Sequence, residues 1–440
     1  MKMLKAIAIV IAVALAVLLI PNLRIFDEQL DPEISRRIAE LPIPPAQGNA
    51  ALYLYGLPAA EGKSPMQVGT EVIKLLQKKR AQDKTVNLSD EEYLAIYGGR
   101  DLDKDWRERY DEHCNVRADS HCLEKLLQIM KDNPVSDSRL LGQLKRYQEL
   151  IRQPHFIEDT RSFDFNSPLP DFHQIWLLGR ITTAQAFLTG TSEEFIASTQ
   201  RDMDFWRLVL RESQTYIGKM VAMMSLHKNL LAISYVLKQE IKLNNTDLQA
   251  LNTLLPPLDK DELDICEMFT GDLRFGVENR DQLLKSIFFD PSLRTLVLTL
   301  MTQASASVNH NFHQTYLPAY NLCRLSAPEF YLNAQRPISR LKLSRFNPYN
   351  LGAKIQTTNM WWPANSIGRP HDINGIYSLV RMQLRAVSGQ NADQSMTLKA
   401  LLTEPEFRNP YTQQLFDLDS TNRQLSFKCF EARNRCAINY

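Results

Sequence analysis

The histidines are the residues whose types and spacing come closest to a metal-binding or catalytic pattern. His310 and His313 are three residues apart, and on a helix this spacing would place both imidazoles on one face, where they could share a metal ion. His371, followed by Asp372, could supply further ligands. No glutamate lies between the first two histidines as a zinc protease would require. The competing interpretation is two polar histidines on a solvated or packed helix, and we expect no metal and no cofactor.

Other residue combinations that could do chemistry are weaker. The chain has no Gly-x-Ser-x-Gly elbow, which holds the nucleophile in many hydrolases. Lys260 lies in an acidic cluster that lacks the glycine and the spacing of an EF-hand loop: Asp259, Asp261, Glu262 and Asp264. A solvated helix start explains this cluster better than a cation site. Trp361 and Trp362 could form a binding platform, although we favour a plug that seals irregular structure onto helices.

Six cysteines point to disulfide bonds, because their number is even and the chain looks exported: Cys114, Cys122, Cys266, Cys323, Cys429 and Cys436. Fifteen pairings are possible. Proximity favours Cys114 with Cys122 and Cys429 with Cys436, and the two remaining cysteines then pair by exclusion. A metal site is the alternative for the first pair, since a histidine precedes each cysteine, but zinc sites usually show tighter cysteine spacing.

The N-terminus carries the export signal. Residues 6–20 form a run of fifteen residues without a polar side chain, preceded by Lys2 and Lys5. Such a run makes about 22 Å of helix, whereas a bilayer core is about 30 Å thick, so we expect a membrane anchor that extends over residues 4–25. The positive-inside rule leaves the N-terminus in the cytoplasm of a bacterium and the bulk of the chain in the periplasm. The alternative is a signal peptide cleaved after Ala16.

The composition excludes one class of partner and predicts a large folded body. The chain has 51 basic and 50 acidic residues, so no strong field attracts nucleic acid. After the anchor, enough residues remain for one extended domain or two closely packed ones. We divide the chain into an anchor over residues 1–26, a helical domain over 27–317 and a C-terminal region over 318–440.

Hydrophobic periodicity predicts a mainly α fold. Apolar stripes at spacings of three and four run through residues 172–239, with a buried helix over 216–237. Successive long helices favour a bundle or array of helical hairpins. Beyond Pro318, repeated prolines predict irregular segments, with one helix over 374–388. Two short apolar runs around residues 419–422 predict a small C-terminal β-hairpin.

Several short motifs occur in a fixed order along most of the chain: Asn49-Ala50, Tyr55-Gly56-Leu57, Pro65-x-x-Val68-Gly69, Tyr216 to Ala222, Asn347 to Ile355, His371-Asp372 and Arg408 to Thr412. In this order they resemble a group of uncharacterised proteobacterial proteins with one N-terminal membrane segment. Asn350-Leu351-Gly352 departs from the compact Asn-Pro-x-Gly-Lys of that group. The resemblance implies a location and an architecture, but no reaction.

The sequence therefore favours a binding or structural role over an enzyme. We expect a membrane-anchored periplasmic protein that binds an envelope protein or another envelope component. One alternative is an envelope hydrolase or metalloenzyme that uses His310, His313 and His371. A second alternative is an anchored chaperone of the lipase-foldase type. Residues 161–165 faintly resemble the Arg-x-x-Phe-Asp-Tyr element of those proteins, but the rest of that motif is missing and we treat the match as chance.

Overall fold

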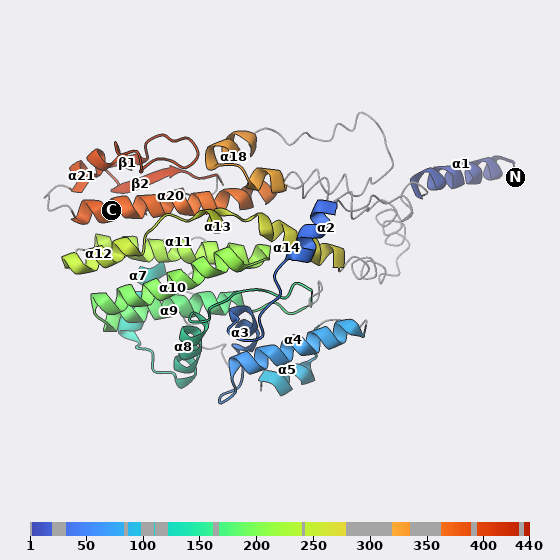
Figure 1. The fold of residues 1–440 in the computed structure, drawn as a ribbon, viewed down its shortest axis with the longest axis horizontal. Coiled ribbons are helices and arrows are strands. Elements are labelled where there is room, and N and C mark those ends of the chain that lie inside the picture. The colour runs from blue at the N-terminus through green and yellow to red at the C-terminus, as the bar shows by residue number, and fades with distance from the viewer. Residues whose placement is uncertain are drawn as a thin grey trace. The chain divides into compact units, whose positions relative to one another are not determined.

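A computed structural model describes the protein at residues 2–19, 32–82, 87–97, 110, 122–161, 167–239, 243–278, 319–334, 362–388, 394–430 and 435–440. Over these residues the chain is mainly helical, and its strands form one antiparallel sheet near the C-terminus (Figure 1). The predicted mainly α fold with a small C-terminal β element is confirmed.

Contacts within the chain define two compact units, each built from two separate stretches of sequence. Unit 1 comprises Met1–Leu41 and Ile265–Ile367, and unit 2 comprises Pro42–Asp264 and Gly368–Tyr440. The predicted divisions after residues 26 and 317 fall among residues outside the description, so they stay predictions.

Unit 1 begins with an apolar helix, α1 (Lys2–Leu19). Its exposed side chains cover more than half of the helix circumference and are 48–67% exposed: Ile7, Ile9, Val10, Ile11 and Val13. This distribution differs from the single buried stripe of a helix packed on a soluble core.

The other described helices of unit 1 are α2 (Pro32–Glu40), α14 (Cys266–Glu278), α18 (Ala327–Ala334) and the first turns of α20 (Trp362–Ser388). Helix α2 packs against α14. A disulfide joins Cys266, the first residue of α14, to Cys323, with their Cα atoms 5.7 Å apart. This is the pairing that the sequence predicted by exclusion. The bond therefore fixes the short helical stretch 319–323 to α14.

In unit 2, α3 (Ala50–Gly56) and α4 (Pro65–Ala81) cross at very short range, and α5 (Asp90–Tyr97) follows. A Cβ atom added to Gly56 would lie 1.8 Å from the carbonyl oxygen of Pro65, and one added to Gly69 would lie 1.8 Å from that of Leu52. Only glycine permits this approach, because any side chain at either position would collide with the opposite backbone.

Five helices form the centre of unit 2: α7 (Cys122–Asp132), α8 (Ser138–Leu150), α9 (Phe172–Thr189), α10 (Ser192–Glu212) and α11 (Tyr216–Lys238). Helix α9 contacts α7, α8 and α10, and α10 contacts α11, as expected for successive hairpins (Figure 1). Thr191 and Glu194 form the capping box that begins α10. Among the described helices, α11 alone is long and apolar enough to span a membrane, but 72% of its most apolar 18-residue stretch is buried in the protein. Residues Lys5–Ala14 form a shorter apolar helix.

A buried polar cluster links α8, α9, α10 and α11. The carboxylate of Asp202 on α10 accepts hydrogen bonds from the Tyr147 hydroxyl and, at 2.5 Å, from the Asn229 side-chain amide. Arg180 is 7% exposed and lies over the Trp176 ring, 5.0 Å from its centroid. Burial raises the pKa of Asp202, while these hydrogen bonds and the Arg180 charge act in the opposite direction. The carboxylate is thus the shared acceptor of this helix core.

The C-terminal part of unit 2 differs from the prediction in two places. Helix α20 begins twelve residues before the predicted start and continues through Pro370. Pro363 stands in its first turn, where the missing N–H costs nothing, and burial of Ile373, Ile376 and Tyr377 offsets the one hydrogen bond lost at Pro370. The remaining helices of unit 2 are α12 (Asn245–Thr253), α13 (Lys260–Leu263) and α21 (Gln394–Leu401).

The predicted hairpin is the first part of a three-stranded sheet. Strands β1 (Asp417–Asp419) and β2 (Gln424–Lys428) form the hairpin, and β3 (Arg435–Asn439) pairs antiparallel with β2. The mixed polarity of β3 hid it from pattern analysis. A disulfide between Cys429 and Cys436 closes the β2–β3 connection and confirms a second predicted pair. Cys114 and the Cys122 side chain lie outside the description, so the third pair stays a prediction.

Replacing Asp202 by alanine should lower the free energy of unfolding by about 3 kcal/mol, because Tyr147, Asn229 and Arg180 lose a shared buried partner. Urea denaturation of the full-length chain, followed by circular dichroism, measures this change. Asp204→Ala, at an exposed acid on the same helix, is the matched control and should change stability by at most about 0.5 kcal/mol. Equal effects of the two substitutions would contradict a structural role for the cluster.

Candidate functional site

Among the described residues, a groove in unit 2 is a candidate site for a ligand. Its volume is about 430 Å³, within the range of small-molecule sites. One wall is the face of α20 that carries Asn374, Ser378 and Arg381, at spacings of four and three residues. The complete lining is Pro257, Asn374, Gly375, Ser378, Arg381, Pro405, Glu406, Arg408, Pro410 and Gln413.

The opposite wall is the loop after α21, and its own hydrogen bonds hold its shape. Arg408 donates to the carbonyl oxygens of Leu402 at 2.5 Å and Thr403 at 3.0 Å, which stand at the C-terminal end of α21. Asn409 is 7% exposed, and its side-chain oxygen accepts from the Tyr411 amide at 2.9 Å in an Asx turn. The guanidinium of Arg408 therefore stabilises the loop, and its donors are used in hydrogen bonds to backbone carbonyls there.

The third wall is the link between α12 and α13, which is tied directly to α20. The side-chain oxygen of Asn374 accepts from the amide of Leu258 at 3.0 Å. Ser378 donates to the carbonyl oxygen of Asn374 at 3.2 Å, one turn earlier. The Asn374 side chain thus ties this link to α20.

Arg381 is the group in the groove with the most binding capacity left. Its side chain is 18% exposed and lies 3.6 Å from a carboxylate oxygen of Glu406. Arg385 holds the other oxygen of the same carboxylate at 2.5 Å and also binds Glu404 at 2.7 Å. Within the described structure Arg381 makes no hydrogen bond of 3.5 Å or less. Its guanidinium is therefore largely buried, with only the long ion pair to Glu406 and the ring of Phe407, 5.9 Å away, as partners.

The groove is lined by polar side chains and prolines. Its polar lining is rich in donors, and its one carboxylate, Glu406, is occupied by two arginines. The lining contains no histidine or cysteine and no carboxylate free to act as a base. An acceptor-rich ligand such as a carboxylate fits this arrangement, with Arg381 as its charged partner.

Of the three histidines proposed as metal ligands, the structure describes His371 alone. His310, His313 and Trp361 lie outside the described residues, as does the side chain of Trp362 at the start of α20. His371 lies on α20, with its ring edge-on to Tyr411 at 6.2 Å. Burial lowers the pKa of His371 to about 4.

Potential metal ligands also come together at the second disulfide, without forming a metal site. Among the described residues, one group of three ligand atoms lies within 4.8 Å of one another: Asp372, Cys429 and Cys436. Both sulfur atoms of this group are bonded to each other. Asp372 instead accepts from the Tyr411 hydroxyl at 2.7 Å and from the Phe430 amide at 2.9 Å. The carboxylate thus anchors α20 to the loop and the sheet.

The acidic cluster around Lys260 is a helix start, but its central carboxylate is not solvated. Asp259 and Glu262 form a capping box at α13. Glu262 is fully buried and accepts from Arg207 at 2.6 Å and from Arg211 at 2.7 Å. The prediction of a solvated cluster was therefore wrong for Glu262, because two arginines of α10, one turn apart, reach across to it.

No protein family, curated protein or solved structure matches this chain. The fold class is mainly α, and the resemblance to the proteobacterial membrane proteins stays a prediction.

Lowering the pH from about 6.5 to 4 should destabilise the protein partly through His371. The folded state keeps this imidazole neutral to about pH 4, whereas the unfolded chain protonates near 6.5, so unfolding takes up a proton in this window. In the His371→Gln variant, the free energy of unfolding should fall by about 2 kcal/mol less than in the wild-type protein between these two pH values. Urea titrations at both pH values measure it, with His173→Gln as the exposed control. A pH dependence unchanged in His371→Gln would contradict this assignment.

Proposed function

We propose that this chain is a cell-envelope protein, anchored in a bacterial inner membrane by α1, that binds a carboxylate-bearing ligand in the unit 2 groove. The observation that carries the binding role is Arg381, a largely covered guanidinium that lines the groove with one ion pair at 3.6 Å. A ligand carboxylate could approach to about 2.8 Å and form two parallel hydrogen bonds, which Glu406 does not.

The neighbouring groups explain why the Arg381 guanidinium has no close carboxylate partner in the described structure. Glu406 is held at 2.5 Å by Arg385, so moving it toward Arg381 would weaken the closer pair. Burying a guanidinium without a full set of acceptors is costly, and a bound anion would remove that cost. Asn374 and Ser378 on the same helix face add polar contacts that could orient the remainder of the ligand.

The proposed location is supported by two features of the chain. Two disulfides occur among the described residues, and such bonds persist in oxidising compartments such as the periplasm. Helix α1 exposes apolar side chains over more than half of its circumference, as a lipid-facing helix does. An anchor of this kind concentrates the groove near the membrane, which favours ligands that are themselves envelope components.

Carboxylates should bind the groove in preference to their uncharged analogues. Thermal denaturation of the full-length protein with a panel of carboxylic acids, each paired with its amide at equal ionic strength, measures this. At least one acid should raise the melting temperature when its amide does not, and Arg381→Gln should weaken its binding at least tenfold, by about 1.4 kcal/mol. Arg139→Gln, at an exposed arginine of α8 outside the groove, is the matched control. Equal responses to acids and amides in the wild-type protein would sink the proposal.

The anchor should remain on the mature protein. Intact-mass measurement of protein recovered from alkali-washed membranes should give the full-length mass, because Ala14-Leu15-Ala16 is followed by further apolar residues that belong to the same segment. A soluble exported protein that the wash releases is the control. A mass that corresponds to cleavage after Ala16, or release by the wash, would contradict the anchored state.

A further inference from the structure

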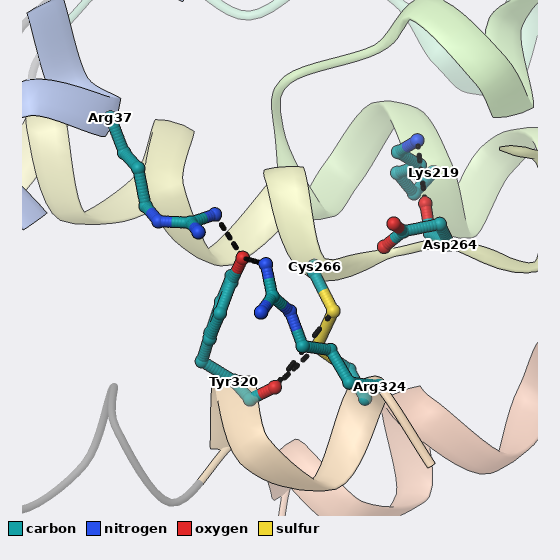
Figure 2. The surroundings of a disulfide bond; sticks show 7 residues. Arg37, Lys219, Asp264, Cys266, Tyr320 and Arg324 are labelled. Carbon is teal, nitrogen blue, oxygen red and sulfur yellow. Dashed lines mark hydrogen bonds between the residues drawn. A yellow bond between two sulfur atoms is a disulfide. The ribbon is translucent and has the colours of Figure 1, made fainter. Parts of the chain in front are cut away.

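In unit 1, two arginines converge on one tyrosine (Figure 2). Arg37 of α2 and Arg324, which follows the helical stretch 319–323, both donate to the hydroxyl oxygen of Tyr320. Their guanidinium carbons lie 4.6 Å and 4.3 Å from the centroid of its ring. Two like charges are therefore held close together around a neutral acceptor, an arrangement that a negative charge would stabilise.

The carboxylates of α2 do not balance the positive charges of this cluster. Glu33 binds Arg37 at 2.9 Å and Arg36 at 2.8 Å, and Glu40 binds Arg36 at 2.5 Å. Arg324 is exposed and has no acidic partner in the described structure, where it contacts the hydroxyl and the ring of Tyr320. Three guanidiniums thus face two carboxylates, and the surplus positive charge lies at Arg324.

Covalent and packing constraints hold these side chains in place. Helix α2, which carries Arg37, packs against α14. The Cys266–Cys323 disulfide joins α14 to the stretch that carries Tyr320, whose carbonyl oxygen lies 3.1 Å from the Cys323 sulfur (Figure 2). Neither sulfur carries a hydrogen, so this is a contact and not a hydrogen bond. Because the chain is held on both sides, little ordering would accompany the binding of an anion.

We propose that Arg37, Arg324 and the hydroxyl of Tyr320 form a binding site for a phosphate group. A phenol oxygen that accepts from both guanidiniums has used its lone pairs, whereas a phosphate offers several anionic oxygens to the same donors. The planar guanidinium matches phosphate geometry in a bidentate contact, and the Tyr320 side chain holds the two guanidiniums next to each other. The site itself is independent of the proposed groove function. Only the source of the phosphate depends on the anchor, which would bring a lipid headgroup within reach.

Calorimetric titration of the full-length protein in an uncharged detergent tests the site. Inorganic phosphate and a short-chain phosphatidylglycerol are the probes, and sodium chloride at equal ionic strength is the reference. We expect at least one probe to bind, and Arg324→Gln to weaken it at least tenfold. The matched control is Arg423→Gln in unit 2, because Arg423 likewise lies over a tyrosine ring, 5.8 Å from the centroid of Tyr440. Circular dichroism of both variants verifies their folding.

The relative affinities of the probes identify the source of the phosphate. Tighter binding of phosphatidylglycerol supports a lipid headgroup, and tighter binding of inorganic phosphate supports a free anion; both outcomes support the site. Tyr320→Phe keeps the ring and removes the hydroxyl, so it should weaken binding by a smaller factor than Arg324→Gln. The proposal is overturned if neither probe binds beyond the chloride reference, or if Arg324→Gln and Arg423→Gln lose affinity equally.

Discussion

The buried carboxylate of Asp202 is the constraint on which the arrangement of unit 2 depends. It is bound from α8 by Tyr147 and from α11 by Asn229, while Arg180 of α9 contributes a nearby charge. Farther along α11, Ser234 donates to the Gln383 side chain of α20 at 2.7 Å, and Gln383 returns a bond to the Ser234 carbonyl at 3.1 Å. The bonds between Ser234 and Gln383 help to fix α20, and with it the wall that carries Arg381, against α11. Hydrophobic burial alone would permit α20 to slide, whereas paired donors and acceptors fix its register.

Competition among arginines for a few carboxylates recurs in both units. Glu262 in unit 2 is enclosed by Arg207 and Arg211, so that pairing is complete and structural. At the groove, Glu406 lies closer to Arg385 than to Arg381. In unit 1, Glu33 pairs with two arginines of α2, whereas Arg324 donates to the hydroxyl of Tyr320. The difference between a structural arginine and an arginine that we propose to bind a ligand lies in this local balance of charge, which the near-zero net charge of the whole chain conceals.

The helices could be predicted because hydrophobic periodicity is a local pattern, and two disulfides could be predicted because the chain has only six cysteines. Periodicity located α8 to α11, and six cysteines left few reasonable pairings. The groove was not predicted, because its lining comes from residues 257, 374–381 and 405–413, and no short motif joins them. The sequence around Arg381 does not distinguish it from the other arginines, because its neighbours in the groove are distant in the chain. The burial of Glu262 was missed for the same reason. By contrast, Gly56 and Gly69, noted as parts of recurring motifs, now have a physical role at the crossing of α3 and α4.

The path of the chain between the two units has a consequence for synthesis. The backbone passes from one unit to the other after Leu41, after Asp264 and again within α20 after Ile367. Residues 42–264 therefore emerge from the ribosome long before residues 368–440, which supply α20 and the sheet of the same unit. Until α20 is made, α11 lacks the helix that covers Ser234, although α10 is already available to pack against it. Neither unit corresponds to a contiguous segment, so neither can complete its core until its second stretch has been made, and partly folded surface stays exposed during synthesis.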